Sequence, residues 1–372
     1  MRGRTIGNAQ VENIQLVAAD ASEALEVTDL RVEFRRGDRM RAVVRGVDFT
    51  LRPGRTLVLL GESGSGKSVT ARALMRLDGA GANVSGRVGF GETDLLGLPE
   101  PVMAGLRGSA IGLVPQDPSG ALDPLRKIGK QIAEVLIRHG AAFSPKEAKP
   151  QAAELLARVG IPDPPRVLDA LPHELSGGMR QRVAIALAIA CRPRVLIADE
   201  PTTALDVTVQ AQVLELFASL CADLKVALLL VTHDVGVARA IGDDVAVMYA
   251  GRLVEFGPAR EVLDAPAHPY TAGLLDAVPT PGVARGTLRA IPGRPPSPDE
   301  PGLDDRCALA PRCRFATAAC SEHRPPLAAV GPGRLAACDV VGGRVPRTAP
   351  EPEAAAETST DPTTDAPLEV LS

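Results

Sequence analysis

The chain contains no tryptophan, and its 372 residues include only two tyrosines and seven phenylalanines. Platforms that stack nucleic-acid bases are built from aromatic side chains and are hard to assemble from so few rings. The formal net charge of −4 provides no broad electrostatic attraction to a phosphate backbone. The composition therefore argues against nucleic acid as the partner.

Long hydrophobic runs are also lacking. Apolar runs such as residues 183–191 are far shorter than the roughly 20 residues that cross a bilayer. Arg2 and Arg4 are followed by an apolar stretch that polar residues interrupt at 11–15, so no signal-peptide core is predicted. We expect a chain that is kept in the cytosol and reaches a membrane only through a partner.

What the sequence does contain is a phosphate-binding loop. Residues 61–68, GESGSGKS, fit the pattern G-x-x-x-x-G-K-[ST], with the apolar run 56–60 before them and helical spacing after them. The glycines allow a tight turn in which backbone N–H groups approach phosphate oxygens. Lys67 would neutralise the β- and γ-phosphates, and the Ser68 hydroxyl would ligate Mg²⁺. The residues expected to bind nucleotide here are Gly61, Ser63, Gly64, Ser65, Gly66, Lys67, Ser68 and Val69.

Two further apolar runs end in residues suited to catalysis. Val195–Ala198 leads into Asp199 and Glu200, and Ala227–Val231 leads toward His233. In a parallel α/β sheet, ligands bind at the carboxyl ends of the strands, so these residues should meet Gly61 at one crevice. Asp199 would hold Mg²⁺, Glu200 would orient or deprotonate the attacking water, and His233 would sense the γ-phosphate.

The rest of the chain alternates between strand and helix patterns. Strands are expected at 30–34, 43–51 and 110–114, and helices between 128 and 160, after which the proline-rich stretch 162–172 indicates a linker. Another helix should open after Ser176, a natural N-cap, and run to about Cys191. Phe34 is either a ring that stacks on a nucleotide base or an inward-facing strand aromatic, and the two alternatives are about equal.

Together these stretches resemble the nucleotide-binding subunit of ATP-binding-cassette (ABC) transporters from about Leu25 to Gly257. The resemblance rests on the P-loop, Gln116 after a strand, the signature LSGGMRQ at 175–181, the run DEPT at 199–202, ALD at 204–206 and His233. It implies an α/β fold: a P-loop NTPase cassette of ABC type with an inserted helical subdomain and a small C-terminal extension of the peptide-importer type.

The resemblance also implies a head-to-tail dimer in which each ATP lies between one P-loop and the partner's signature. Ser176, Gly177 and Gly178 would then serve the ATP of the partner subunit, and Asp206 would lie near the dimer seam. Gln116 would sense Mg²⁺ and the attacking water and lead into the surface that meets the membrane subunits. The implied partners are two membrane-spanning permease subunits, a second ABC ATPase subunit and an extracytoplasmic solute-binding protein. The second ATPase subunit is a paralogue or a second copy of this chain, and the paralogue is favoured.

Three details are similar to the dipeptide and oligopeptide importer group. They are QDP at 116–118 continuing to LDP at 122–124, HPYT at 268–271 followed by two leucines, and a C-terminal extension that carries cysteines. Asp123 departs from the group, which more often has asparagine there. The implied function is ATP hydrolysis that powers peptide import at the cytoplasmic face of the membrane. Import of nickel or another small solute, a soluble ABC ATPase and a regulatory iron–sulfur protein are the alternatives.

The six cysteines fall into two groups. Cys191 and Cys221 lie in apolar stretches and are expected to be small core residues. Cys307, Cys313, Cys320 and Cys338 cluster in the extension, where a disulfide framework is not expected in a reducing cytosol. Their spacing differs from the paired C-x₂-C of common zinc sites, and four thiolates can hold an iron–sulfur cluster or Zn²⁺. The resemblance places a 4Fe–4S cluster first and Zn²⁺ second; four free thiols are the remaining alternative.

These features divide the chain into four parts. Residues 1–24 are expected to be a flexible leader and 25–257 the nucleotide-binding domain, with its helical subdomain at about 92–180. Residues 258–344 form the C-terminal extension. The Pro/Thr/Ala/Glu-rich stretch 345–372 is expected to be disordered.

Overall fold

The computed structural model describes residues 14, 23–203, 205–279, 290–340 and 342–345. The predicted leader and the predicted disordered tail lie almost entirely outside these residues. The described strands are β1 (Leu25–Arg36), β2 (Arg39–Leu51), β3 (Thr56–Leu60), β4 (Ala82–Phe90), β5 (Thr93–Asp94), β6 (Ile111–Val114), β7 (Val195–Asp199), β8 (Ala227–Thr232), β9 (Asp244–Tyr249), β10 (Arg252–Pro258), β11 (Ala328–Gly331) and β12 (Arg334–Ala336).

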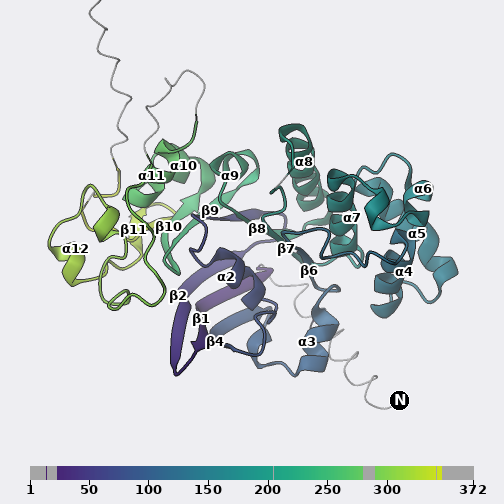
Figure 1. Cartoon of the computed structure of the whole chain (residues 1–372), viewed down its shortest axis with the longest axis horizontal. Coiled ribbons are helices and arrows are strands. Elements are labelled where there is room, and N and C mark those ends of the chain that lie inside the picture. Colours follow the sequence, from purple (N-terminus) through teal and green to yellow (C-terminus); the bar gives the residue numbers. More distant parts are fainter. Residues whose placement is uncertain (1–13, 15–22, 204, 280–289, 341, 346–372) are drawn as a thin grey trace, which may run out of the picture.

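Helices flank these strands at both ends of the molecule. They are α2 (Lys67–Ala73), α3 (Glu100–Leu106), α4 (Ile128–Arg138), α5 (Pro145–Arg158), α6 (Pro164–Asp169), α7 (Gly177–Ile189), α8 (Val207–Leu224), α9 (Val235–Ile241), α10 (Ala259–Asp264), α11 (Pro269–Asp276) and α12 (Ala319–Glu322). Short 3₁₀ turns occur at η1 (Leu95–Gly97), η2 (Pro172–Glu174) and η3 (Ala310–Arg312). Helices α4 to α7 gather at one end of the view in Figure 1, and the extension with α12 and β11 lies at the other.

The central element is an eight-stranded sheet in the order β11-β12-β10-β9-β3-β8-β7-β6. Strands β9, β3, β8, β7 and β6 are parallel, as the apolar runs predicted, because strands buried on both faces need no alternation with polar residues. A separate four-stranded sheet in the order β2-β1-β4-β5 is antiparallel. The predicted α/β class is confirmed.

The pleat of the parallel strands divides the core into two clusters. In β3, Val58 and Leu60 pack with the helical side of the sheet, whereas Leu57 and Leu59 pack with the antiparallel sheet. Successive strand residues point to opposite faces, so each strand contributes to both clusters. Both faces of the main sheet are therefore covered by packed side chains, which hold the strand ends in place.

The proline-rich stretch at 162–172 is not an open linker, so that prediction was wrong. It forms α6, which begins with prolines at its first positions and has Asp163 as its N-cap, and it leads into η2. Proline is tolerated in the first turn of a helix because that N–H has no helical partner. Val167 and Leu168 of α6 are buried in the core of the helical layer.

One helix in the described part of the chain, α8, is long and apolar enough to cross a membrane by length and composition alone. Val213, Phe217 and Leu220 of this helix are buried in the main core cluster. Their spacing forms one apolar face, which is the pattern of a helix that packs on a sheet. We therefore assign α8 to the core of the cassette.

The C-terminal extension is built onto the edge of the main sheet. Strand β12 pairs with β10 in an antiparallel ladder, and β11 pairs with β12. Glu255 of β10, fully buried, accepts hydrogen bonds from the N–H groups of Ala267 (2.7 Å) and His268 (3.0 Å) and from Arg334 of β12 (3.2 Å). A buried carboxylate needs such partners, so this site ties the extension to the cassette.

Candidate functional site

The P-loop connects β3 to α2, as predicted, and its glycines are required by close contacts. A Cβ at Gly61 would lie 2.3 Å from the carbonyl oxygen of Met248. Gly66 has a φ of +106°, and a Cβ there would lie 2.8 Å from Met248 Cε and 3.0 Å from the carbonyl oxygen of Val43. Strands β2 and β9 therefore lie against the loop at these two glycines, and larger residues there would displace it.

The side chain of Lys67 folds back onto the first two residues of the P-loop. Its side chain is buried, with an exposed fraction of 4% for the residue, and Nζ donates to the carbonyl oxygens of Gly61 (2.8 Å) and Glu62 (2.9 Å). Burial lowers the pKa of this amine, and the nearby carboxylates of Glu200 and Asp199 oppose the shift. The cation is thus held at the mouth of the loop, where phosphate charge would be neutralised.

Two polar groups of the loop fit a phosphate with its metal ion. Ser65 Oγ is buried and has no hydrogen-bond partner, which is costly unless a ligand supplies one. Ser68 Oγ donates to Asp199 Oδ1 at 2.8 Å, so the hydroxyl and the carboxylate converge although 131 positions separate them. Burial raises the pKa of Asp199, and the hydrogen bond from Ser68 opposes the shift. Hydroxyl and carboxylate oxygens are the ligands that Mg²⁺ prefers.

Glu200 is held by four groups from three strand ends. Its carboxylate accepts hydrogen bonds from Gln116 Nε2 (3.1 Å) and Thr203 Oγ1 (3.1 Å) and lies 3.4 Å from Nδ1 of His233. Its backbone N–H donates to the carbonyl oxygen of Val231, and its φ is +46°, an uncommon conformation for a side chain other than glycine. Such strain persists only where the surroundings enforce it and is typical of active sites.

The expected convergence of strand ends is therefore present. Asp199 ends β7 and Glu200 follows it, Gln116 follows β6, and His233 follows β8. Thr203 was missed by the sequence analysis, because its signal is only a hydroxyl three positions after the glutamate. The catalytic roles assigned to these residues remain predictions.

For three of the residues predicted to bind nucleotide, the structure shows only where they lie. Ser63 is exposed, and Val69 is half-buried against the second core cluster. Phe34 is half-buried on β1, where it pairs with Arg41 and Ala82 and packs against the same cluster. Both alternatives for Phe34 stay open.

The predicted signature residues lie at the start of α7, and Asp206 lies at the start of α8. Ser176 caps α7, and its Oγ accepts from the N–H of Met179 at 3.3 Å, as predicted. Asp206 caps α8 and accepts from the N–H of Val209 at 2.9 Å. Among the hydrogen bonds of the described residues, none joins Ser176, Gly177 or Gly178 to the P-loop, and their role in a partner's ATP site remains a prediction.

The four extension cysteines line one small cavity of about 30 Å³. The Cys307 N–H donates to the carbonyl oxygen of Cys320 at 3.0 Å, and Cys338 follows β12 at the sheet edge. Within the described ranges, however, no three His, Cys, Asp or Glu side chains stand close enough to form a metal site as placed. Burial raises the pKa of the Cys307 and Cys313 thiols. Cys221 is buried in the core and Cys191 packs against it, as predicted.

Comparisons with known proteins agree with this geometry. Residues 44–203 match the family profile "ABC transporter", and residues 254–320 match "Oligopeptide/dipeptide transporter, C-terminal region". The chain is 46% identical over 318 residues to the oligopeptide transport ATP-binding protein OppD of Salmonella typhimurium, covering 86% of this chain and 94% of that protein. The chain belongs to the ABC transporter family.

Other relatives and solved structures support the same assignment. The dipeptide transport ATP-binding protein DppD of Lactococcus lactis is 44% identical over 329 residues, covering 88% of this chain and 94% of the relative. A dimeric structure of the ATP-binding cassette MJ0796 bound to ADP and Pi superposes with a TM-score of 0.57 at 27% identity, over 63% of this chain and 99% of that one. The fold and the ATP-binding cassette predicted from the motifs are thus confirmed, and ATP with Mg²⁺ is the expected ligand of the P-loop.

Gly178 offers a test of the signature's packing. A Cβ at this position would lie 2.8 Å from Cγ1 of Val209, whereas one at Gly177 would meet nothing within 4 Å. We predict that Gly178→Ala lowers the free energy of unfolding in urea by about 1–3 kcal/mol through overcrowding. Adding Val209→Ala should restore part of the loss, and Gly177→Ala is the matched control. Equal stability of the two single glycine variants would contradict the packing described.

Proposed function

We propose that this chain is the ATP-hydrolysing subunit that powers import of di- and oligopeptides across the cytoplasmic membrane. The observation that carries the proposal is the hydrogen bond from Ser68, on the helix that follows β3, to Asp199 at the end of β7, with Glu200 next to it. The peptide specificity rests on two features: relatives that are named oligopeptide and dipeptide transport proteins, and a C-terminal region of the matching type. Among the alternatives, nickel import has no comparable support.

In the proposed mechanism the chain's residues position and neutralise charge. Lys67 faces the phosphates, and Ser68 with Asp199 would hold Mg²⁺, which neutralises charge on the phosphate oxygens when bound. Glu200 accepts the proton of the attacking water, while Gln116 and His233 hold its carboxylate in place. Phosphoryl transfer requires little covalent chemistry from the protein, so this fixed geometry is the main contribution.

The proposed assembly contains two cassettes and a membrane channel. Ser176, Gly177 and Gly178 would contact the ATP held by a second ATPase subunit, a paralogue of this chain, near the seam marked by Asp206. Two membrane-spanning permease subunits and an extracytoplasmic solute-binding protein complete the complex, with this chain peripheral at the cytoplasmic face. We retain the division into a nucleotide-binding domain at 25–257 and an extension at 258–344 as part of the proposal.

We further propose that the cysteine cavity of the extension binds an iron–sulfur cluster. A single Zn²⁺ ion bonds sulfur at about 2.3 Å and needs its four ligands almost in contact, whereas a cluster inserts its own iron and sulfide between more distant thiolates. The four thiols that line one cavity are the observation that supports the cluster, and Zn²⁺ is the alternative metal. The Phe315 N–H donates to Cys313 Sγ at 3.4 Å, and Thr317 Oγ1 lies 3.5 Å from Cys320 Sγ, contacts of the kind that tune bound clusters.

Replacing Glu200 by glutamine tests both the ATPase activity and its coupling to peptide import. The substitution removes the proton acceptor but keeps the side chain's size, so ATP should bind normally while turnover falls by about 10²- to 10⁴-fold. Steady-state phosphate release and nucleotide binding by the purified chain measure the two effects. Cells that carry only this variant should lose uptake of a labelled oligopeptide. Near-normal turnover would contradict the role of Glu200, and intact uptake would contradict peptide import.

Iron and sulfide analysis of the anaerobically purified chain tests the cluster. We expect about four iron and four sulfide per chain, the content of one cubane cluster. Cys313→Ser should lose the iron, and the control Cys221→Ser, whose thiol lies outside the cavity, should retain it. A colourless, iron-free protein would contradict the proposal, and one zinc per chain would establish the alternative metal.

A further inference from the structure

The C-terminal extension reaches directly into the P-loop through Arg312. This residue ends η3, and its exposed fraction is 7%. Its guanidinium donates from Nη1 to Glu62 Oε2 (2.9 Å) and from Nη2 to Glu62 Oε1 (3.1 Å), across 250 positions of sequence. Two parallel N–H···O bonds to one carboxylate fix both distance and orientation. Glu62 is the second residue of the P-loop, and nothing in the loop pattern assigns it a role.

The surroundings of this ion pair hold both partners in place. Arg312 Nη1 also lies 3.2 Å from the Tyr249 hydroxyl, and its Nε donates to the carbonyl oxygen of Pro292 at 2.8 Å. The Tyr249 ring packs against Tyr270 with centroids 4.5 Å apart. The Tyr270 hydroxyl in turn accepts from the N–H of Glu62 at 2.7 Å. Within the extension, Arg312 therefore restrains the side chain of Glu62, and Tyr270 of α11 restrains its backbone.

Glu62 passes this restraint to the groups that face phosphate. Its carbonyl oxygen accepts from Lys67 Nζ at 2.9 Å and from the N–H of Ser65 at 3.2 Å. The position of the Glu62 peptide thus sets both the lysine and the turn that carries the unpartnered Ser65 hydroxyl. A loop that is ordered before the ligand arrives loses less conformational entropy on binding.

We propose that Arg312 is a positioning residue of the ATP site, which holds the P-loop in its phosphate-binding shape through the ion pair with Glu62. The inference rests on the proposed ATP site and makes the extension part of that site's construction. Arg312 acts through Glu62, which it holds directly by the ion pair and indirectly through the Tyr249–Tyr270 contact. Its neighbour Cys313 lines the cysteine cavity, so the fold of the extension around that cavity determines where the guanidinium lies.

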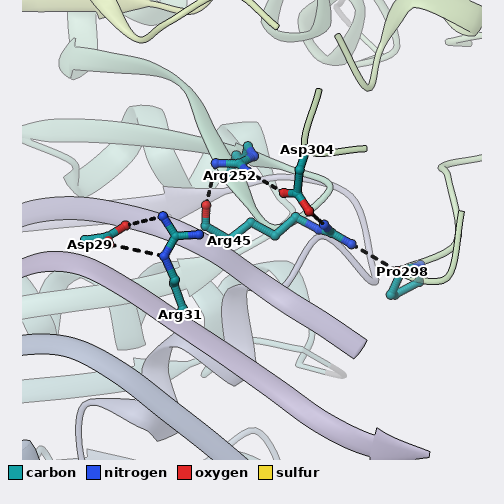
Figure 2. A network of polar contacts seen from close by, with 6 residues as sticks. All are labelled: Asp29, Arg31, Arg45, Arg252, Pro298 and Asp304. Carbon is teal, nitrogen blue, oxygen red and sulfur yellow. Dashed lines mark hydrogen bonds and ion pairs between the residues drawn. The ribbon is translucent and has the colours of Figure 1, made fainter. Parts of the chain in front are cut away.

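A second tether of the extension provides the matched control. Figure 2 shows Asp304 bridging Arg45 of β2 and Arg252 of β10, at 2.6 and 2.5 Å, while Arg45 also donates to the carbonyl oxygen of Pro298. This network fastens the same extension to the cassette but makes no contact with Glu62. Asp304→Asn weakens the docking of the extension and leaves the P-loop pair intact.

Isothermal titration of the purified full-length chain with Mg²⁺ and the non-hydrolysable analogue AMP-PNP tests the proposal. We expect Arg312→Gln and Glu62→Gln each to weaken binding about tenfold, equivalent to about 1.4 kcal/mol. The double variant should be no weaker than either single variant, because both remove the same interaction. Arg312→Lys should recover only part of the affinity, since lysine lacks the planar fork. Turnover at saturating ATP should change less than the affinity does.

Thermal unfolding of each variant without nucleotide separates positioning from simple docking. Asp304→Asn should lower the melting temperature yet bind AMP-PNP like the wild type. Wild-type affinity in Arg312→Gln, or equal weakening by Asp304→Asn, would overturn the proposal. Arg312→Lys and Glu62→Gln decide the question if Arg312→Gln does not fold. A wild-type chain that binds no AMP-PNP would contradict the ATP site itself and the inference with it, whereas normal wild-type binding with unaffected variants contradicts the inference alone.

Discussion

The parallel pairing of β3, β8 and β7 is the constraint on which the site depends. Their register sets the ends of the three strands side by side, with Leu60 opposite Thr232 and Asp199 opposite Val231. Each strand is packed on both faces, so none can slip without exposing buried side chains. Short turns after these ends then deliver Gly61, Glu200 and His233 to one edge. The geometry of the proposed ATP site is therefore a consequence of sheet packing, with each side chain placed by the strand that precedes it.

The extension adds a second level of restraint to this edge. Glu255 is buried among N–H groups and Arg334, and Asp304 bridges two arginines of the cassette. Arg312 completes the attachment at the P-loop. These are charged contacts with little exposure on at least one side, where removal of one partner leaves a costly unpaired group. Apolar residues of the extension, among them Val262, Tyr270 and Leu275, are also buried in the main core cluster, so apolar packing and these polar ties together dock the extension on the cassette.

The sequence predicted the features that local patterns encode. The run at 56–60 became β3 over the same residues, and Ser176 caps its helix as the motif required. The prediction of a linker at 162–172 was wrong because proline is an ambiguous local signal. Prolines at 164 and 172 begin helical turns here, although proline elsewhere interrupts a helix. The sequence also could not find long-range pairs such as Arg312 with Glu62, because no periodicity or spacing relates residues 250 positions apart. The strand ends were predictable as a group, but Thr203 beside Glu200 was not, since its contact depends on the strained turn at Glu200.

The most direct test of the central claim is the identity of the proteins that this chain binds in its own membrane. Affinity purification of the chain from gently solubilised native membranes, followed by mass spectrometry, measures this. The account predicts recovery of two multi-spanning membrane proteins together with a second cassette subunit. Recovery of ribosomal or DNA-repair proteins, with no membrane protein among them, would contradict the transport function while leaving the ATP site in place.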